Sequence, residues 1–172
     1  SKSYNQIKND IEKKGYIFLT NFINQEYYDK LLDSFPEIHE LNKSKSPLKN
    51  YDIGYIYLKD RHNPSFKNKN YLSNFYDYIR SKKFQKEVSM IFDNQYNFFC
   101  KNILTSIATK SSFLIPHKDS LSKETKDINL NFIYFVDGYD KNIEYSGGTF
   151  ISKDNNGNKI LLSPLTLKNS VL

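Results

Sequence analysis

The pattern of apolar positions in the first half of the chain is that of amphipathic helices. Apolar residues recur every three or four positions, which places them on one face of a helix. Asn24 and Ser81 stand where they can cap the second and fourth helices, and Gly15 and Pro36 stand where the first and second should end. The pattern therefore predicts helices over residues 3–14, 24–35, 72–79 and 81–92.

Strands are indicated by two kinds of segment. In the first half, Tyr16–Phe22 and Tyr51–Leu58 are short runs rich in aromatic and β-branched residues. From about residue 98 the apolar period shortens toward two, which is the alternation of a strand. The predicted strands there span residues 103–109, 128–136, 147–151, 159–162 and 169–172, with a turn at Asp154–Asn158 before the fourth.

This order of elements favours an α+β fold in a single domain of residues 1–172. Residues 1–97 should form a helical support region with short strands, and residues 98–172 the core of a sandwich or jelly roll. The chain is long enough to bury a core. Its 38% of hydrophobic residues and 16% of aromatic residues indicate a globular protein rather than a disordered one.

The net charge of +6 and the isoelectric point near 9.1 raise the question of a nucleic-acid partner. Such a partner requires a clustered basic stripe. Here Arg61 and Arg80 are the only arginines, and the lysines are scattered among acidic residues. We therefore expect no nucleic-acid partner.

The single cysteine and the lack of a long apolar run exclude further classes. Cys100 by itself cannot build a disulfide framework or a cysteine-rich zinc site, and its apolar neighbours predict a buried packing role. No apolar run approaches the length of a membrane-spanning helix, and the N-terminus is polar. The sequence therefore predicts a cytoplasmic protein with no signal peptide and no membrane partner.

The segment Pro116-His117-Lys118-Asp119 carries the candidate chemistry. In an extended chain, residues two positions apart project from the same side, so His117 and Asp119 can bind one metal ion together. An imidazole and a carboxylate suit ferrous iron, and three ligands on one face would leave positions open for a cosubstrate and oxygen. A pattern this short also arises by chance, and a surface histidine beside a loop aspartate is the alternative.

The sequence around this motif resembles the 2-oxoglutarate- and iron(II)-dependent dioxygenases, in particular their prolyl-hydroxylase-like branch. Residues 112–120 are similar to the family's His-x-Asp strand, residues 132–137 to its next core strand, and Gly147-Gly148-Thr149-Phe150 to the start of a later strand. Residues 162–164 and 169–172 resemble the following pair. The resemblance implies a double-stranded β-helix, the jelly-roll or cupin-like fold, with N-terminal supporting helices.

The resemblance also implies an oxidoreductase that uses Fe(II) and 2-oxoglutarate to hydroxylate its substrate. His117 and Asp119 would be two of the three iron ligands, and the presence of Asp119 favours hydroxylation over halogenation. The family's third ligand, a histidine, and its basic residue for 2-oxoglutarate would both lie beyond Leu172. The chain as printed is therefore expected to be truncated before them, and it could be inactive. His39 and His62 do not lie where the pattern requires a histidine, and we expect both at the surface.

Asn131 is the candidate cosubstrate-binding residue, because it aligns with a polar position of the family's pocket. An amide on the face of a strand, bonded to a neighbour, is the alternative. Two other functions stay open, namely a non-catalytic jelly-roll module for binding or structure and a cupin-like metalloenzyme that does not use 2-oxoglutarate. The resemblance fixes neither the substrate, which could be a small molecule or a peptidyl residue, nor the oligomeric state.

Overall fold

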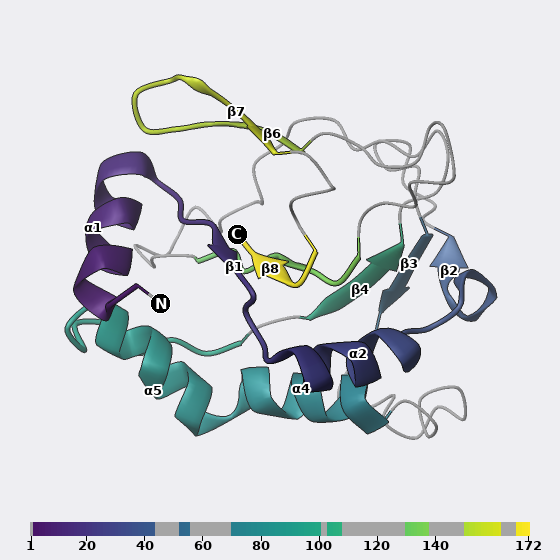
Figure 1. The fold of residues 1–172 in the computed structure, drawn as a ribbon. Coiled ribbons are helices and arrows are strands. Elements are labelled where there is room, and N and C mark those ends of the chain that lie inside the picture. Colours follow the sequence, from purple (N-terminus) through teal and green to yellow (C-terminus); the bar gives the residue numbers. More distant parts are fainter. Residues whose placement is uncertain are drawn as a thin grey trace, which may run out of the picture.

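The fold is given by a computed structural model of the whole chain (Figure 1). The structure describes residues 2–43, 52–55, 70–100, 103–107, 130–137, 150–162 and 168–172. The helices α2, α4 and α5 form a layer along the lower side of the view, and the small antiparallel sheets lie above them. The described fold is therefore mixed helix and strand, as the sequence predicts, whereas the jelly roll stays a prediction.

The predicted helices are confirmed, and their boundaries follow the capping residues. They are α1 (Tyr4–Lys14), α2 (Gln25–Asp33), the short 3-10 helix η1 (Ile38–Glu40), α4 (Asn70–Arg80) and α5 (Lys82–Ile91). Ser3, Asn24 and Ser81 each accept a hydrogen bond from a backbone N–H in the first turn of α1, α2 and α5. Gly15 ends α1 with a φ of 80°, the left-handed conformation that favours glycine. None of the described helices is long and apolar enough to cross a membrane.

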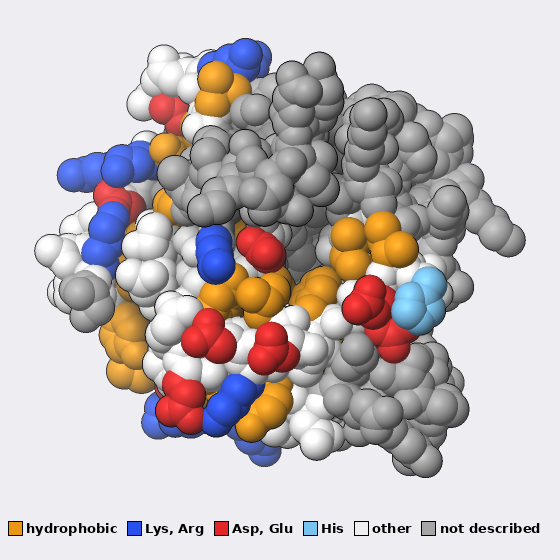
Figure 2. Space-filling view, turned by 45° about the vertical axis from the view of Figure 1, so that its right-hand side comes forward, with side chains coloured by type: hydrophobic (Ala, Val, Ile, Leu, Met, Phe, Trp, Pro, Cys, Tyr) orange, Lys and Arg blue, Asp and Glu red, His pale blue; other side chains and the backbone are white. Residues whose placement is uncertain are grey.

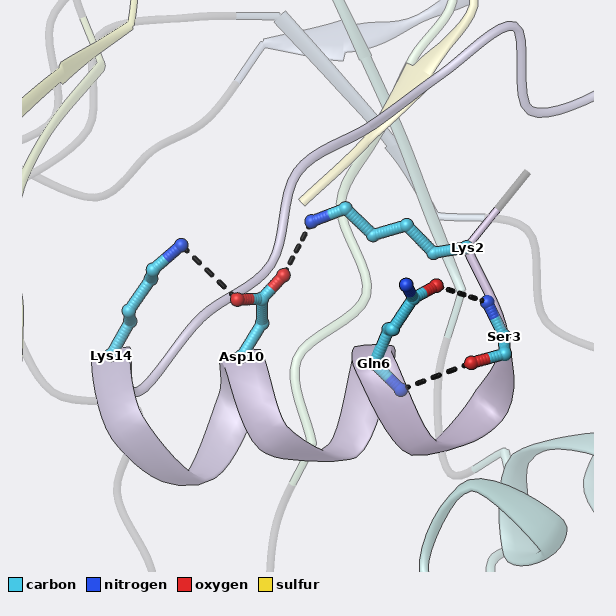
Figure 3. Close-up of polar contacts among 5 residues, drawn as sticks. All are labelled: Lys2, Ser3, Gln6, Asp10 and Lys14. Carbon is cyan, nitrogen blue, oxygen red and sulfur yellow. Dashed lines mark hydrogen bonds and ion pairs between the residues drawn. The ribbon is translucent and has the colours of Figure 1, made fainter.

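Side chains along α1 fix this helix at its start and near its end (Figure 3). The Ser3 hydroxyl accepts a hydrogen bond from the Gln6 N–H at 3.3 Å, and the Gln6 side-chain oxygen accepts one from the Ser3 N–H at 2.8 Å, which makes a capping box. The Asp10 carboxylate lies between the ammonium groups of Lys2 and Lys14. Hydrogen bonds from Lys2 and then Lys14 lower the pKa of the Asp10 carboxyl. Because these charges face solvent, the ion pairs add little to stability.

Short strands form three antiparallel sheets within the described residues. The strands are β1 (Leu19–Thr20), β2 (Asn42–Lys43), β3 (Asp52–Tyr55), β4 (Leu104–Ile107), β5 (Tyr134–Phe135), β6 (Phe150–Lys153), β7 (Lys159–Leu162) and β8 (Ser170–Val171). They pair in the orders β1-β8-β5, β2-β3-β4 and β6-β7. Because β8 lies between β1 and β5, segments from the two ends of the chain share one sheet (Figure 1).

The strand predicted at Tyr16–Phe22 is shorter than the apolar pattern indicates. Among the residues that the structure describes, only Leu19–Thr20 of this run pairs as a strand. The next residue, Asn21, has a φ of 50°, a left-handed conformation that interrupts an extended chain. The prediction was therefore wrong in length: the turn at Asn21 ends the strand after Thr20, and residues 16–18 are not paired with a described strand.

The strand predicted over residues 128–136 is also shorter in its described part. Tyr134–Phe135 pairs with β8, and Ile133 and Leu172 exchange two further backbone hydrogen bonds of 2.9 and 3.0 Å. Residues 128 and 129 lie outside the described residues. The predicted hairpin turn at Asp154–Asn158 is confirmed between β6 and β7.

The main core lies between α2, α4 and β5. Leu31 of α2 is fully buried, and it packs with a stripe on α4 whose members are three or four residues apart. That stripe consists of Leu72, Phe75, Tyr76 and Ile79. Tyr134 of β5 and Phe84 of α5 pack against the same cluster, so β5 is held on the helical layer.

Asn169 joins three segments immediately before β8. It has a φ of 47° and is 4% exposed. Its Oδ1 accepts hydrogen bonds from the Ile23 N–H at 3.2 Å and from the Tyr134 hydroxyl at 3.0 Å. Its Nδ2 donates to the Ile23 carbonyl at 2.9 Å. One buried amide therefore ties β8 both to the chain after β1 and to β5.

Replacing Asn169 with alanine is expected to lower the free energy of unfolding by about 2–4 kcal/mol, because buried polar groups lose partners and a Cβ remains at positive φ. Asn169→Gly tolerates the backbone conformation and loses only the side-chain hydrogen bonds, so its free energy of unfolding should fall by less. Urea denaturation of both variants measures the difference. Wild-type stability in Asn169→Ala would contradict the role given to this amide.

Candidate functional site

The candidate metal ligands lie in the stretch of chain that joins two sheets. β4 of the β2-β3-β4 sheet precedes His117 and Asp119, and β5 of the β1-β8-β5 sheet follows them. His117, Asp119 and the Gly147-Gly148 pair lie outside the described residues. Among the residues that the structure does describe, no three His, Cys, Asp or Glu side chains are grouped as metal ligands would be. The iron ligands therefore remain a prediction. The structure describes the strands that precede and follow them in the sequence.

Helix α4 contacts both flanking strands through adjacent residues. The Tyr76 hydroxyl is hydrogen-bonded to the Thr105 hydroxyl of β4, and both residues are buried. The Phe75 ring lies 5.0 Å from the Tyr134 ring of β5, measured between centroids. Because Phe75 and Tyr76 are neighbours on one rigid helix, α4 sets the spacing between the strands that precede and follow the candidate ligands.

The sequence did not reveal this pairing of hydroxyl groups. Periodicity placed Tyr76 and Tyr134 on apolar faces, but it carries no information on partners that come from distant strands. Burial raises the pKa of both phenols, so they stay neutral and hydrogen-bonded at physiological pH. Thr105 gave no signal of its own, since a threonine in a strand is common on either face.

Tyr28 supports the end of β5 from α2. It is 1% exposed, and its hydroxyl donates a hydrogen bond to the Val136 carbonyl at 2.8 Å. Burial raises the pKa of Tyr28 to about 12, and the nearby carboxylates of Asp137 and Asp29 add to the shift. The Lys168 ammonium lies over the same ring, 5.5 Å from its centroid.

Raising the pH above about 10 is expected to destabilise the protein, because Tyr28 resists ionisation in the folded state. Between the usual pKa near 10 and the folded pKa of about 12, the folded state keeps a proton that the unfolded state releases, so stability falls as pH rises. Urea unfolding at about pH 9 and about pH 11 measures the loss. Tyr28→Phe should reduce this pH dependence, because it removes the buried phenol. An unchanged dependence in Tyr28→Phe would contradict the assignment.

Asn131 lies just before β5 and is exposed. Phe132 packs against Phe84 of α5, with ring centroids 5.6 Å apart, and Tyr134 packs against Phe75 of α4. Alternate residues therefore face the helices, and the same alternation places Asn131 on the opposite side. Contact between Asn131 and 2-oxoglutarate stays a prediction.

His39 and Cys100, the other described residues considered for chemistry, have ordinary surroundings. His39 lies in η1 and is exposed, as expected, beside acidic side chains (Figure 2). His62 lies outside the described residues. Cys100 is half-buried and packs against the core, and burial raises the pKa of its thiol. These observations agree with a surface histidine and a packing cysteine.

Two comparisons with known proteins give no match to this chain. A scan against models of protein families finds none that matches the chain, and a search of curated proteins likewise finds no match. The likeness to the dioxygenases is therefore carried by the motif residues between 112 and 172 alone. Function is inferred from these residues and from the described fold.

Proposed function

We propose that the protein is an iron(II)- and 2-oxoglutarate-dependent oxygenase that hydroxylates a C–H bond of its substrate. The observation that carries the proposal is the His117-Lys118-Asp119 triplet in the segment between β4 and β5. These donors fit the metal by their chemistry, since two histidines and one carboxylate on one face are a common site for ferrous iron. His117 and Asp119 would supply one imidazole and the carboxylate, and the resemblance puts the second histidine beyond Leu172.

The arrangement of the described strands supports the proposal. All described strand pairs are antiparallel, and the chain passes from one three-stranded sheet to the other between β4 and β5. A jelly roll consists of two antiparallel sheets between which the chain crosses. The helices pack against one face of β5, and the alternation of side chains puts Asn131 on the other face, where we propose that it contacts the cosubstrate.

The residues of this chain would bind and orient the reactants. The bound iron and 2-oxoglutarate would supply the oxidation, in which the substrate C–H and O2 give C–OH while 2-oxoglutarate gives succinate and CO2. His117 must bind as a neutral imidazole and Asp119 as a carboxylate, so iron binding should weaken at acidic pH. α4 would hold the strands on either side of these ligands through its contacts with Thr105 and Tyr134.

Anaerobic titration of the protein, as its gene encodes it, with Fe(II) tests the proposal. An oxygenase should bind iron at micromolar concentration, change its visible absorption when 2-oxoglutarate is added, and form succinate when O2 is admitted. Iron binding without a response to 2-oxoglutarate would favour the cupin-like metalloenzyme. A failure to bind iron would favour the non-catalytic jelly-roll module, and either outcome would contradict the proposal.

A further inference from the structure

The β6-β7 hairpin, residues 150–162, forms a two-stranded sheet of its own. Its strands pair from Phe150 with Leu162 to Lys153 with Lys159. Within the described residues, neither strand pairs with a strand of the two other sheets, and the hairpin projects above them in Figure 1. None of its described side chains is buried. An isolated hairpin of this size is only marginally stable in water, so its attachment to the rest of the fold decides its stability.

The turn of the hairpin is stiff. Asp154 accepts hydrogen bonds from the N–H of Asn156 at 2.9 Å and from the N–H of Asn158 at 2.7 Å, and its second oxygen accepts from Asn158 Nδ2 at 2.9 Å. These bonds lower the pKa of the Asp154 carboxyl, so it stays charged and bonded at neutral pH. The tip can therefore act as one body in its contacts with other elements.

The tip of the hairpin contacts the C-terminal end of α1. The Asn155 N–H donates to the Lys14 carbonyl at 3.1 Å, and Asn155 Nδ2 donates to the Glu12 carbonyl at 3.3 Å. These are carbonyls of the last turn of a helix, which has no later residues of its own to bond them. Gly15 allows the approach, since a Cβ at that position would lie 2.4 Å from Asn155 Oδ1.

We propose that residues 150–162 are a flap that opens separately from the rest of the protein, and that the contact between Asn155 and the end of α1 is the clasp that holds it closed. The flap is stiff at its tip, none of its described side chains is buried, and the clasp adds hydrogen bonds and close packing at one point. Local opening at such a point requires far less free energy than global unfolding. The proposal is independent of the oxygenase chemistry.

Native-state amide hydrogen exchange tests the clasp. Asn155→Ala removes the hydrogen bond to Glu12, and it should speed exchange of the amides in 150–153 and 159–162 by about 3- to 10-fold, with α4 unchanged. Asn156→Ala is the matched control, because it removes the neighbouring asparagine side chain, which does not reach α1 within the described structure. Equal exchange in the two variants would overturn the clasp.

A double-mutant cycle distinguishes the effect of Gly15 on the clasp from its effect on the end of α1. Gly15→Ala should speed exchange in the flap by at most the factor of about 3- to 10-fold that is expected of Asn155→Ala, since the new Cβ displaces the Asn155 side chain from its bond to Glu12. In the Asn155→Ala background the three nearest atoms are absent, so Gly15→Ala should then add little in the flap. Additive effects would show that Gly15 acts only through the helix. If flap amides exchange at the rate of α4 amides in the wild type, the flap does not open separately.

Discussion

Replacing His117 with alanine is expected to lower succinate formation that depends on Fe(II) and 2-oxoglutarate by more than about 100-fold. Loss of a residue that only orients a metal ligand costs about 10- to 100-fold in affinity or activity, and loss of a ligand itself should cost more. Asp119→Ala should have a comparable effect, because it removes the carboxylate that completes the pair. Iron affinity, measured anaerobically, should fall together with turnover in both variants.

His39→Ala is the matched control for the loss of a histidine. His39 is exposed in η1, and the same substitution there should leave iron affinity and succinate formation at the wild-type level. Thermal unfolding of the three variants shows whether each is folded. A folded His117→Ala variant that retains wild-type turnover would refute the assignment of the metal site.

Replacing Leu31 with alanine is expected to lower the free energy of unfolding by about 2–5 kcal/mol. Leu31 is 0% exposed and packs against the apolar stripe of α4, so truncation leaves a cavity between α2 and α4. The loss is large because the same stripe carries Phe75 and Tyr76, which hold β5 and β4. Urea denaturation of the wild type and of Leu31→Ala measures this difference in the free energy of unfolding.

Leu161 provides the matched control for this core substitution. It is 56% exposed on β7, so Leu161→Ala should change the free energy of unfolding by less than about 0.5 kcal/mol. Similar losses at the two positions would mean that the core does not lie where the structure places it.

The sequence by itself predicted the elements whose signals are local. Capping residues such as Asn24 and Ser81 and the stripe of α4 act within a few positions of the chain, so their patterns can be read without a fold. The turn at Asp154–Asn158 belongs to the same class. The His117-x-Asp119 motif is also local, and it remains the basis of the proposed chemistry.

Only the tertiary structure decided which strands pair and how far they extend. β8 lies between β1 and β5 because Asn169 bonds to segments that are far apart in sequence, and no local pattern records such contacts. The strand predicted at Tyr16–Phe22 begins only at Leu19 and ends after Thr20, where the backbone of Asn21 turns. Likewise, the contact of Asn155 with α1 depends on a turn and a helix end that meet only in the folded chain. Pattern determines the elements, whereas the free energy of burial and hydrogen bonding between distant segments determines their arrangement.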